Sequence, residues 1–146
     1  PRILRERATA ERPFEMRPAT MPDDPFSPSP MPPSHAVWLR TVRTLPDDPA
    51  LHRYLLAYAS DHAFLTTALR PHGVTWLSPG MQVASLDHVM WFHRPFRVDE
   101  WLLHVMDSPA ASGARGLVRG RIYTQAGELV ASTAQEGLIR QRAQSS

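Results

Sequence analysis

The chain has 146 residues, of which 42% are apolar and 8% aromatic, enough for one packed domain and short for two. It contains no cysteine, which excludes disulfide scaffolds, thiolate zinc sites and cysteine nucleophiles. Its 16 basic residues are all arginine, and they are scattered among 14 acidic residues. This pattern is typical of a solvated surface, with an anionic small molecule as the alternative partner, and it gives no indication of nucleic-acid binding.

No apolar run approaches the roughly 18 residues of a membrane-spanning helix. The N-terminus also lacks the charged-then-apolar pattern of a secretory signal. We therefore expect a soluble, cytoplasmic protein without a membrane span. The first residue is proline and not methionine, so we expect the chain to be a piece of a longer protein.

Prolines are concentrated in the N-terminal part of the chain. Nine of the 15 fall within the first 33 residues, most densely over residues 22–33. Because proline has a restricted φ and no amide donor, this stretch cannot form a helix or a central strand. We interpret residues 1–34 as an extended linker that contributes at most a short edge strand, over residues 11–18.

One principal helix is predicted near the middle of the chain. Asp48 can cap its N-terminus, and Pro49 occupies the first helical position, where its missing amide donor does no harm. Apolar side chains then recur at helical spacing at positions 51, 54, 55, 58 and 59. The pattern predicts a helix that runs to about Asp61, with further helical turns through Leu69.

The other regular segments are predicted to be strands. Their expected ranges are 35–43, 82–92, 100–107, 115–124 and 128–139. A turn at residues 125–127 joins the last two as an antiparallel hairpin. The order strand, helix, four strands predicts an α+β fold in which one antiparallel sheet packs on one helix.

Seven histidines raise the question of a metal site. His88 and His93 are five residues apart on one expected strand and would point to opposite faces. His52 and His62 are ten residues apart on the helix, too far to share an ion. No HExxH or comparable spacing occurs. We expect no metal site, and we interpret these histidines as ordinary core or surface residues.

Ser85, Asp87 and His88 have the composition of a hydrolase triad. On one regular strand, however, Ser85 and His88 would point to opposite faces, which prevents a local hydroxyl–imidazole bond. A GxSxG elbow and a glycine-rich phosphate loop are also missing. Asp61, Ser85 and Gln135 remain as polar residues in apolar elements, and each has an ordinary interpretation: a solvated helix end, a small core residue and a water-facing amide.

Three segments resemble the type II acyl-CoA thioesterases: LHRYLLAYASDHAFL (51–65), SPGMQVASLDHVMWFHRPFRVDEWLL (78–103) and YTQAGELVASTAQEGLIR (123–140). Members of this family consist of two tandem hotdog domains, a hotdog being a long helix wrapped by a curved antiparallel sheet. This chain is similar only to the second. The resemblance implies an α+β hotdog thioesterase domain over residues 35–140, followed by a C-terminal tail at 141–146.

The resemblance also implies a catalytic group, because Asp61, Ser85 and Gln135 stand where the family has an aspartate, a threonine or serine, and a glutamine. Asp61 would act as the general base on a water molecule that attacks the thioester. Ser85 and Gln135 would orient that water, and Gln135 would also donate toward the developing oxyanion. The implied reaction converts acyl-CoA to a free fatty acid and coenzyme A, with no metal and no cofactor.

Four strand residues are expected to be core and not the lining of an acyl tunnel: Val83, Val89, Trp91 and Leu102. Asp87 and His88 are expected to be buried polar residues that hold the sheet against the helix.

A lone hotdog leaves an apolar surface and a sheet edge uncovered. We therefore expect pairing with the N-terminal hotdog half or with a second copy as a homo-oligomer. Arg94, Arg97 and Arg115 are the arginines that we consider for the phosphates of coenzyme A. The alternative to an enzyme is a non-catalytic acyl-CoA-binding or assembly half of a double-hotdog protein.

Overall fold

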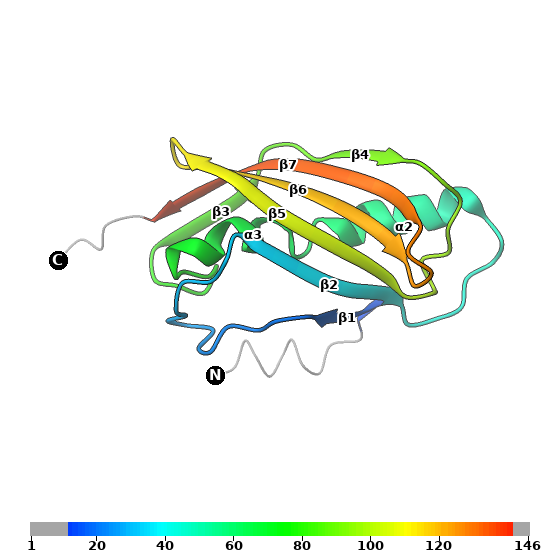
Figure 1. The fold of residues 1–146 in the computed structure, drawn as a ribbon, viewed down its shortest axis with the longest axis horizontal. Helices are drawn as coiled ribbons and strands as arrows, with labels where there is room; N and C mark the ends of the chain where they lie inside the picture. Colours follow the sequence, from blue (N-terminus) through cyan, green and yellow to red (C-terminus); the bar gives the residue numbers. More distant parts are fainter. Residues whose placement is uncertain (1–11, 142–146) are drawn as a thin grey trace.

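The computed structural model describes residues 12–141 of the chain. Its elements, in chain order, are β1 (Phe14–Pro18), β2 (Ser34–Thr41), α2 (Pro49–Ser60), α3 (Phe64–Leu69), the 3-10 turn η1 (Arg70–His72), β3 (Met81–Ser85), β4 (Val89–Phe92), β5 (Leu102–Ser112), β6 (Arg115–Thr124) and β7 (Leu129–Gln141). The sheet curls around α2 and α3, which lie along its inner face (Figure 1). This confirms the predicted α+β hotdog fold. No helix within residues 12–141 is long and apolar enough to cross a membrane.

All neighbouring strands of the sheet are antiparallel, in the order β1-β2-β5-β6-β7-β3, and β4 also pairs with β7. The predicted hairpin of the last two strands is present as β6 and β7. The short edge strand expected within residues 11–18 is present as β1. The strand expected over residues 100–107 begins two residues later and extends to Ser112. One edge of the sheet is therefore β1, and the opposite edge is formed by β3 and β4.

The strand predicted over residues 82–92 is in fact two strands, and this is the main correction to the sequence prediction. Between the pair Ser85–Gly137 and the pair Val89–Ala134, three residues of the edge strand face two residues of β7. The amides of Leu86 and Asp87 both point to the carbonyl of Glu136, at 3.0 and 3.4 Å. One extra residue is thus inserted into the edge strand, as in a β-bulge. Each side chain after the insertion therefore points to the opposite face of the sheet from the one expected for a regular strand.

The inserted residue also decides which edge-strand side chains enter the core. Val89 and Trp91 pair with Ala134 and Ser132, and their side chains are 42% and 51% exposed. Their prediction as core residues is therefore wrong, because it assumed one regular strand. Val83 is half-buried, and of the four residues only Leu102 is fully buried in the core.

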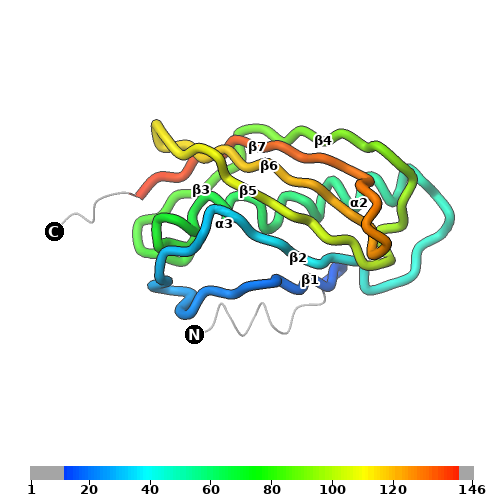
Figure 2. The backbone as a smooth tube through the Cα atoms, viewed as in Figure 1, coloured from blue at the N-terminus to red at the C-terminus, as the bar shows by residue number. Residues whose placement is uncertain are grey.

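The helical segment begins as predicted and is interrupted once. The Asp48 side chain accepts hydrogen bonds from the amides of Ala50 and Leu51, and Pro49 is the first helical residue. The α2 helix ends at Ser60, and a short turn precedes α3, so the two helices follow one another along the sheet (Figure 2). The interruption leaves Asp61 at the corner between the two helices.

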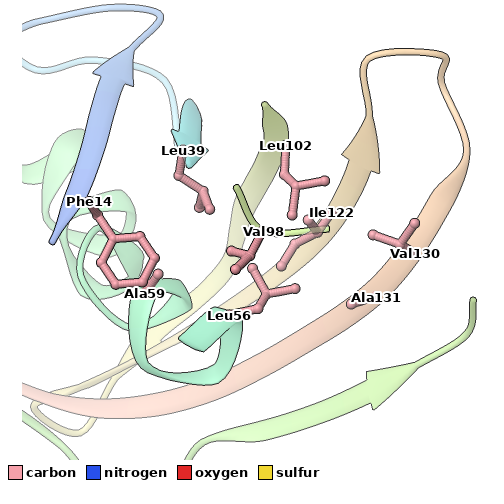
Figure 3. Packing of buried hydrophobic residues seen from close by; sticks show 9 residues of the cluster. All are labelled: Phe14, Leu39, Leu56, Ala59, Val98, Leu102, Ile122, Val130 and Ala131. Carbon is pink, nitrogen blue, oxygen red and sulfur yellow. The ribbon is translucent and has the colours of Figure 1, made fainter. Parts of the chain in front are cut away.

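Two clusters of buried side chains hold the helices to the sheet. The first lies under α2 and contains Leu39, Leu56, Val98, Leu102, Ile122 and Val130, among others (Figure 3). The second lies under α3 and contains Val37, Phe64, Ala68, Met106 and Val118. Glycines let α3 approach closely: a Cβ at Gly116 would lie 2.8 Å from the Ala68 side chain, and one at Gly137 would overlap Leu65. A side chain at position 116 would therefore press on α3 through Ala68, and one at position 137 would force the Leu65 side chain to move.

The proline-rich segment between β1 and β2 has no regular secondary structure, and it packs against the end of the helical region. The Met31 amide donates to the Arg70 carbonyl at 2.9 Å, and the Thr75 hydroxyl donates to the Pro25 carbonyl at 2.7 Å. These bonds tie the segment to η1 and to the loop that follows it.

His104 is a buried titratable group next to the second cluster. It is 2% exposed, its Nε2 lies 3.1 Å from Thr133 Oγ1, and its ring stacks on Phe64. Burial lowers the pKa of His104 from 6.5 to about 3, with smaller contributions from the charges of His88 and His35. Burial likewise lowers the pKa of His35 to about 4.

We predict that acid weakens the fold through His104. Below pH 6.5 the unfolded chain takes up a proton that the folded chain cannot bind until its pKa of about 3, so stability falls as pH decreases through this interval. One such group contributes a slope of about 1.4 kcal/mol per pH unit in the free energy of unfolding. Replacing the imidazole in His104→Asn should reduce the slope by about this amount in urea titrations between pH 6.5 and 4. An unchanged slope would contradict the assignment.

Candidate active site

The three residues singled out by the sequence come together from three elements. Asp61 lies at the α2–α3 corner, Ser85 ends β3, and Gln135 lies within β7. The Ser85 hydroxyl donates to Asp61 Oδ1 at 3.1 Å, and Gln135 Nε2 donates to the same oxygen at 2.8 Å. Gln135 Nε2 also lies 2.5 Å from Ser85 Oγ. A carboxylate, a hydroxyl and an amide therefore form one closed hydrogen-bonded group.

The members of this group differ in their burial. Gln135 is 1% exposed, so its interpretation as a water-facing amide is wrong. Asp61 and Ser85 are exposed, and both line a cavity of about 250 Å³. The buried amide thus forms the base of the group, and the carboxylate and hydroxyl are open to a molecule in the cavity.

His88 reaches the buried amide from its far side. Its Nδ1 lies 2.8 Å from Gln135 Oε1, and its Nε2 lies 2.8 Å from Ser60 Oγ at the end of α2. Because a carboxylate only accepts hydrogen bonds, Gln135 must turn its NH₂ toward Asp61 and its oxygen toward His88. His88 Nδ1 must then carry a proton. Asp61 as an acceptor and His88 as a donor therefore hold the Gln135 amide in one orientation from its two ends.

The contact between His88 and Gln135 is the functional feature that sequence reasoning missed. On a regular strand His88 would point away from Ser85, but the inserted residue places both side chains against Gln135. The signal was present in the sequence, since the polar pair Asp87–His88 interrupts an otherwise apolar run. Asp87 is exposed and not buried as expected. Its carboxylate accepts the Glu136 amide at 2.7 Å and so holds the inserted residue in place.

Of the three arginines considered for phosphate binding, Arg97 is committed to internal contacts. It pairs with Asp47, with Asp99 Oδ2 at 2.9 Å and with the Leu45 carbonyl at 2.7 Å. This guanidinium lowers the pKa of Asp99 to about 2. Arg94 and Arg115 are more exposed, and their guanidinium groups contact the Leu129 carbonyl at 2.7 Å and the Glu136 carboxylate at 3.4 Å, respectively.

His52 and His93 lie in separate parts of the fold. His52 is buried, where its Nδ1 accepts the Val98 amide at 3.1 Å. His93 contacts the Ser132 hydroxyl at 2.8 Å on the exposed side of β7. Within residues 12–141, no three histidine or carboxylate side chains gather in a way that could hold a metal ion.

Comparisons with known proteins agree with the resemblance drawn from the motifs. The family model described as acyl-CoA thioesterase matches residues 3–138. The chain is 45% identical over 140 residues to acyl-CoA thioesterase 2 of Haemophilus influenzae, covering 96% of this chain and 49% of that protein. It is 42% identical over 151 residues to acyl-coenzyme A thioesterase 8 of Homo sapiens, covering 99% of this chain and 44% of that protein.

A solved structure gives the same result. The chain superposes on the acyl-CoA thioesterase II TesB2 of Mycobacterium marinum with a TM-score of 0.76 and 46% identity, covering 90% of this chain and 50% of that chain. The chain spans about half the length of the curated relatives it matches and corresponds to their C-terminal half. From its sequence and its fold alike, the chain belongs to the acyl-CoA thioesterase family.

Proposed function

We propose that this chain is the catalytic half of an enzyme that hydrolyses acyl-CoA thioesters to a free fatty acid and coenzyme A. The observation that carries the proposal is the closed group of Asp61, Ser85 and Gln135 at a cavity. The names of its relatives support the same reaction. Within the chain we assign catalysis to residues 35–140, with residues 1–34 as a linker and edge segment and 141–146 as a tail.

The reaction begins when a water molecule attacks the thioester carbonyl carbon and gives a proton to Asp61. Both donors of the group bond to Oδ1 of Asp61, which leaves Oδ2 to take that proton. The tetrahedral intermediate then expels the sulfur of coenzyme A, and the proton passes from Asp61 to the departing thiolate. The products are a carboxylic acid and a thiol, and the carboxylate of Asp61 is regenerated.

The geometry favours orientation over oxyanion binding as the role of Gln135. An amide nitrogen has two hydrogens, and those of Gln135 point to Asp61 and to Ser85. A third bond to the oxyanion would break one of these contacts. We therefore assign Gln135 to holding the carboxylate and the hydroxyl in position.

The first prediction of this function concerns the general base. Asp61→Asn preserves the shape of the side chain but cannot accept the proton of water, so the rate of thioester hydrolysis should fall by about 10²–10⁴-fold. The measurement is the release of free thiol from acyl-CoA by the whole native protein. Asp107→Asn is the matched control, because Asp107 is a carboxylate paired with Arg119 at the surface, and it should keep normal activity.

Two outcomes would contradict this assignment. Full activity in Asp61→Asn would remove Asp61 from the mechanism. Binding of acyl-CoA without turnover by the unaltered, assembled protein would instead favour the alternative of a non-catalytic acyl-CoA-binding half.

A second prediction concerns His88, to which we give a positioning role. The variant His88→Phe keeps a ring beside Phe64 but loses the donor to Gln135, so the amide oxygen is left without a partner and the amide is held less firmly against Asp61 and Ser85. We expect kcat to fall by about tenfold to a hundredfold at nearly unchanged KM, with about 1–3 kcal/mol lost in the free energy of unfolding. The control His93→Phe alters a histidine of the same edge and should change neither value. A purely structural role would leave kcat of the folded fraction unchanged.

The open edge of the sheet supports a further part of the proposal, that this chain pairs with another hotdog unit. Among residues 12–141, β3 and β4 are hydrogen-bonded to a neighbouring strand on one side only, to β7. Large apolar side chains are exposed there, namely Leu86, Val89, Trp91 and Phe92. An edge of this kind is normally covered. The N-terminal hotdog half or a second copy of the chain would cover it.

We therefore predict that the native protein contains hotdog units in pairs. Light scattering gives the mass of the assembly, and mass spectrometry of the native protein gives the mass of one chain. Either a chain with two hotdog units or a dimer of chains with one unit each would agree with the prediction. A stable monomer with one hotdog unit would contradict it.

A further inference from the structure

The cavity at Asp61 and Ser85 extends away from the catalytic group between two walls. One wall is formed by Asp61 at the α2–α3 corner and by Leu65 and Leu69, which are four residues apart on α3. The other wall is β3, in which Ser85 and Val83 line the same cavity at a spacing of two. Along the first wall the residue numbers increase away from the catalytic atoms, and along β3 they decrease, so the two walls run in opposite chain directions.

A second cavity shares the lining residue Leu69 with the first. It has a volume of about 310 Å³ and is lined by Val74, Met81 and Ile139, among others. Met81 continues the β3 stripe by two residues beyond Val83. Leu69 lines both cavities, and its side chain is 2% exposed. The Leu69 side chain is therefore the partition between them.

We infer that Leu69 sets the length of acyl chain that this site accepts, by closing the far end of the cavity at Asp61 and Ser85. The inference rests on the proposed thioesterase function. The acyl chain lies between α3 and β3, with its carbonyl at Asp61 and its methyl end at Leu69. The second cavity is reached only when the Leu69 side chain is shortened.

The chemistry of the first cavity fits an acyl chain and not the coenzyme A arm. Beyond the catalytic end most of its lining is apolar and comes from Leu65, Leu69, Trp76, Val83 and Ala84; Thr66 and His62 are the polar residues that also line it. The residues that line it include no arginine, and its one acid, Asp61, would repel phosphates. Each methylene that is buried in such a site strengthens binding by about fourfold, equivalent to about 0.8 kcal/mol. Apolar walls of fixed length therefore translate directly into a chain-length preference.

The first experiment shortens the Leu69 side chain that separates the two cavities. In the whole native protein, Leu69→Ala joins the two cavities, so the ratio of kcat/KM for palmitoyl-CoA to that for butanoyl-CoA should rise by about tenfold or more. Leu56→Ala is the matched control, because Leu56 is an equally buried helical leucine that lines neither cavity. It should leave the ratio unchanged while costing similar stability.

The second experiment blocks the cavity at a residue that tolerates a change of size. Val83 is half-buried on the edge strand, so Val83→Trp fills the space between Ser85 and Leu69. The same ratio should fall by about tenfold or more, while butanoyl-CoA is still hydrolysed. Val42→Trp is its control, because Val42 is an exposed valine outside both cavities. This experiment decides the question if Leu69→Ala does not fold.

The outcomes separate this inference from the function on which it rests. Hydrolysis with a chain-length ratio that neither variant changes would overturn the inference and leave the thioesterase function standing. An equal rise in KM for every acyl length would assign the cavity to the coenzyme A arm, which also overturns the inference. Absence of hydrolysis for all acyl-CoA in the unaltered protein would overturn both.

Discussion

The candidate site depends on one extra residue in the edge strand. Without it, Ser85 and His88 would lie on opposite faces of the sheet, and only one of them could reach Gln135. The Asp87 carboxylate and two edge-strand amides bond to the backbone of Glu136, which holds the insertion in register with β7. Because of this insertion, Ser85 and His88, which are three residues apart, lie on the same face of the sheet as Gln135.

The buried amide of Gln135 connects this irregularity to the chemistry. A buried polar side chain is stable only when its donors and its acceptor are all bonded. Here Asp61 and Ser85 accept hydrogen bonds from the Gln135 NH₂ group, and His88 donates to the Gln135 carbonyl oxygen. Since His88 also contacts Ser60, the same chain of bonds joins the end of α2 to the centre of the sheet. The network that packs the helix is therefore the network that orients the proposed catalytic group.

The sequence predicts those parts of the fold that are determined by residues within the element itself or next to it in the chain. The start of α2 follows from Asp48 and Pro49, and the β6–β7 hairpin follows from alternation and a turn. The insertion between β3 and β4 follows no such local rule, because the polar pair Asp87–His88 interrupts the apolar residues of 82–92 without indicating that a residue is added there. The errors at Val89, Trp91 and His88 all come from this one register shift. The grouping of Asp61, Ser85 and Gln135 came from resemblance, since no periodicity relates three separate elements.

The proposed hydrolysis of the thioester and the proposed preference for acyl chain length both depend on the close approach of α3 to the sheet. Gly137 pairs with Ser85 in the register of β3 and β7, and a side chain there would overlap Leu65. The absence of that side chain lets α3 settle onto β7, which brings Asp61 within reach of Gln135 at one end. The same placement brings Leu69 against the sheet at the other end, between the two cavities. A change that lifted α3 would therefore disturb the general base and the acyl boundary together, whereas a change at Leu69 alone would move only the boundary.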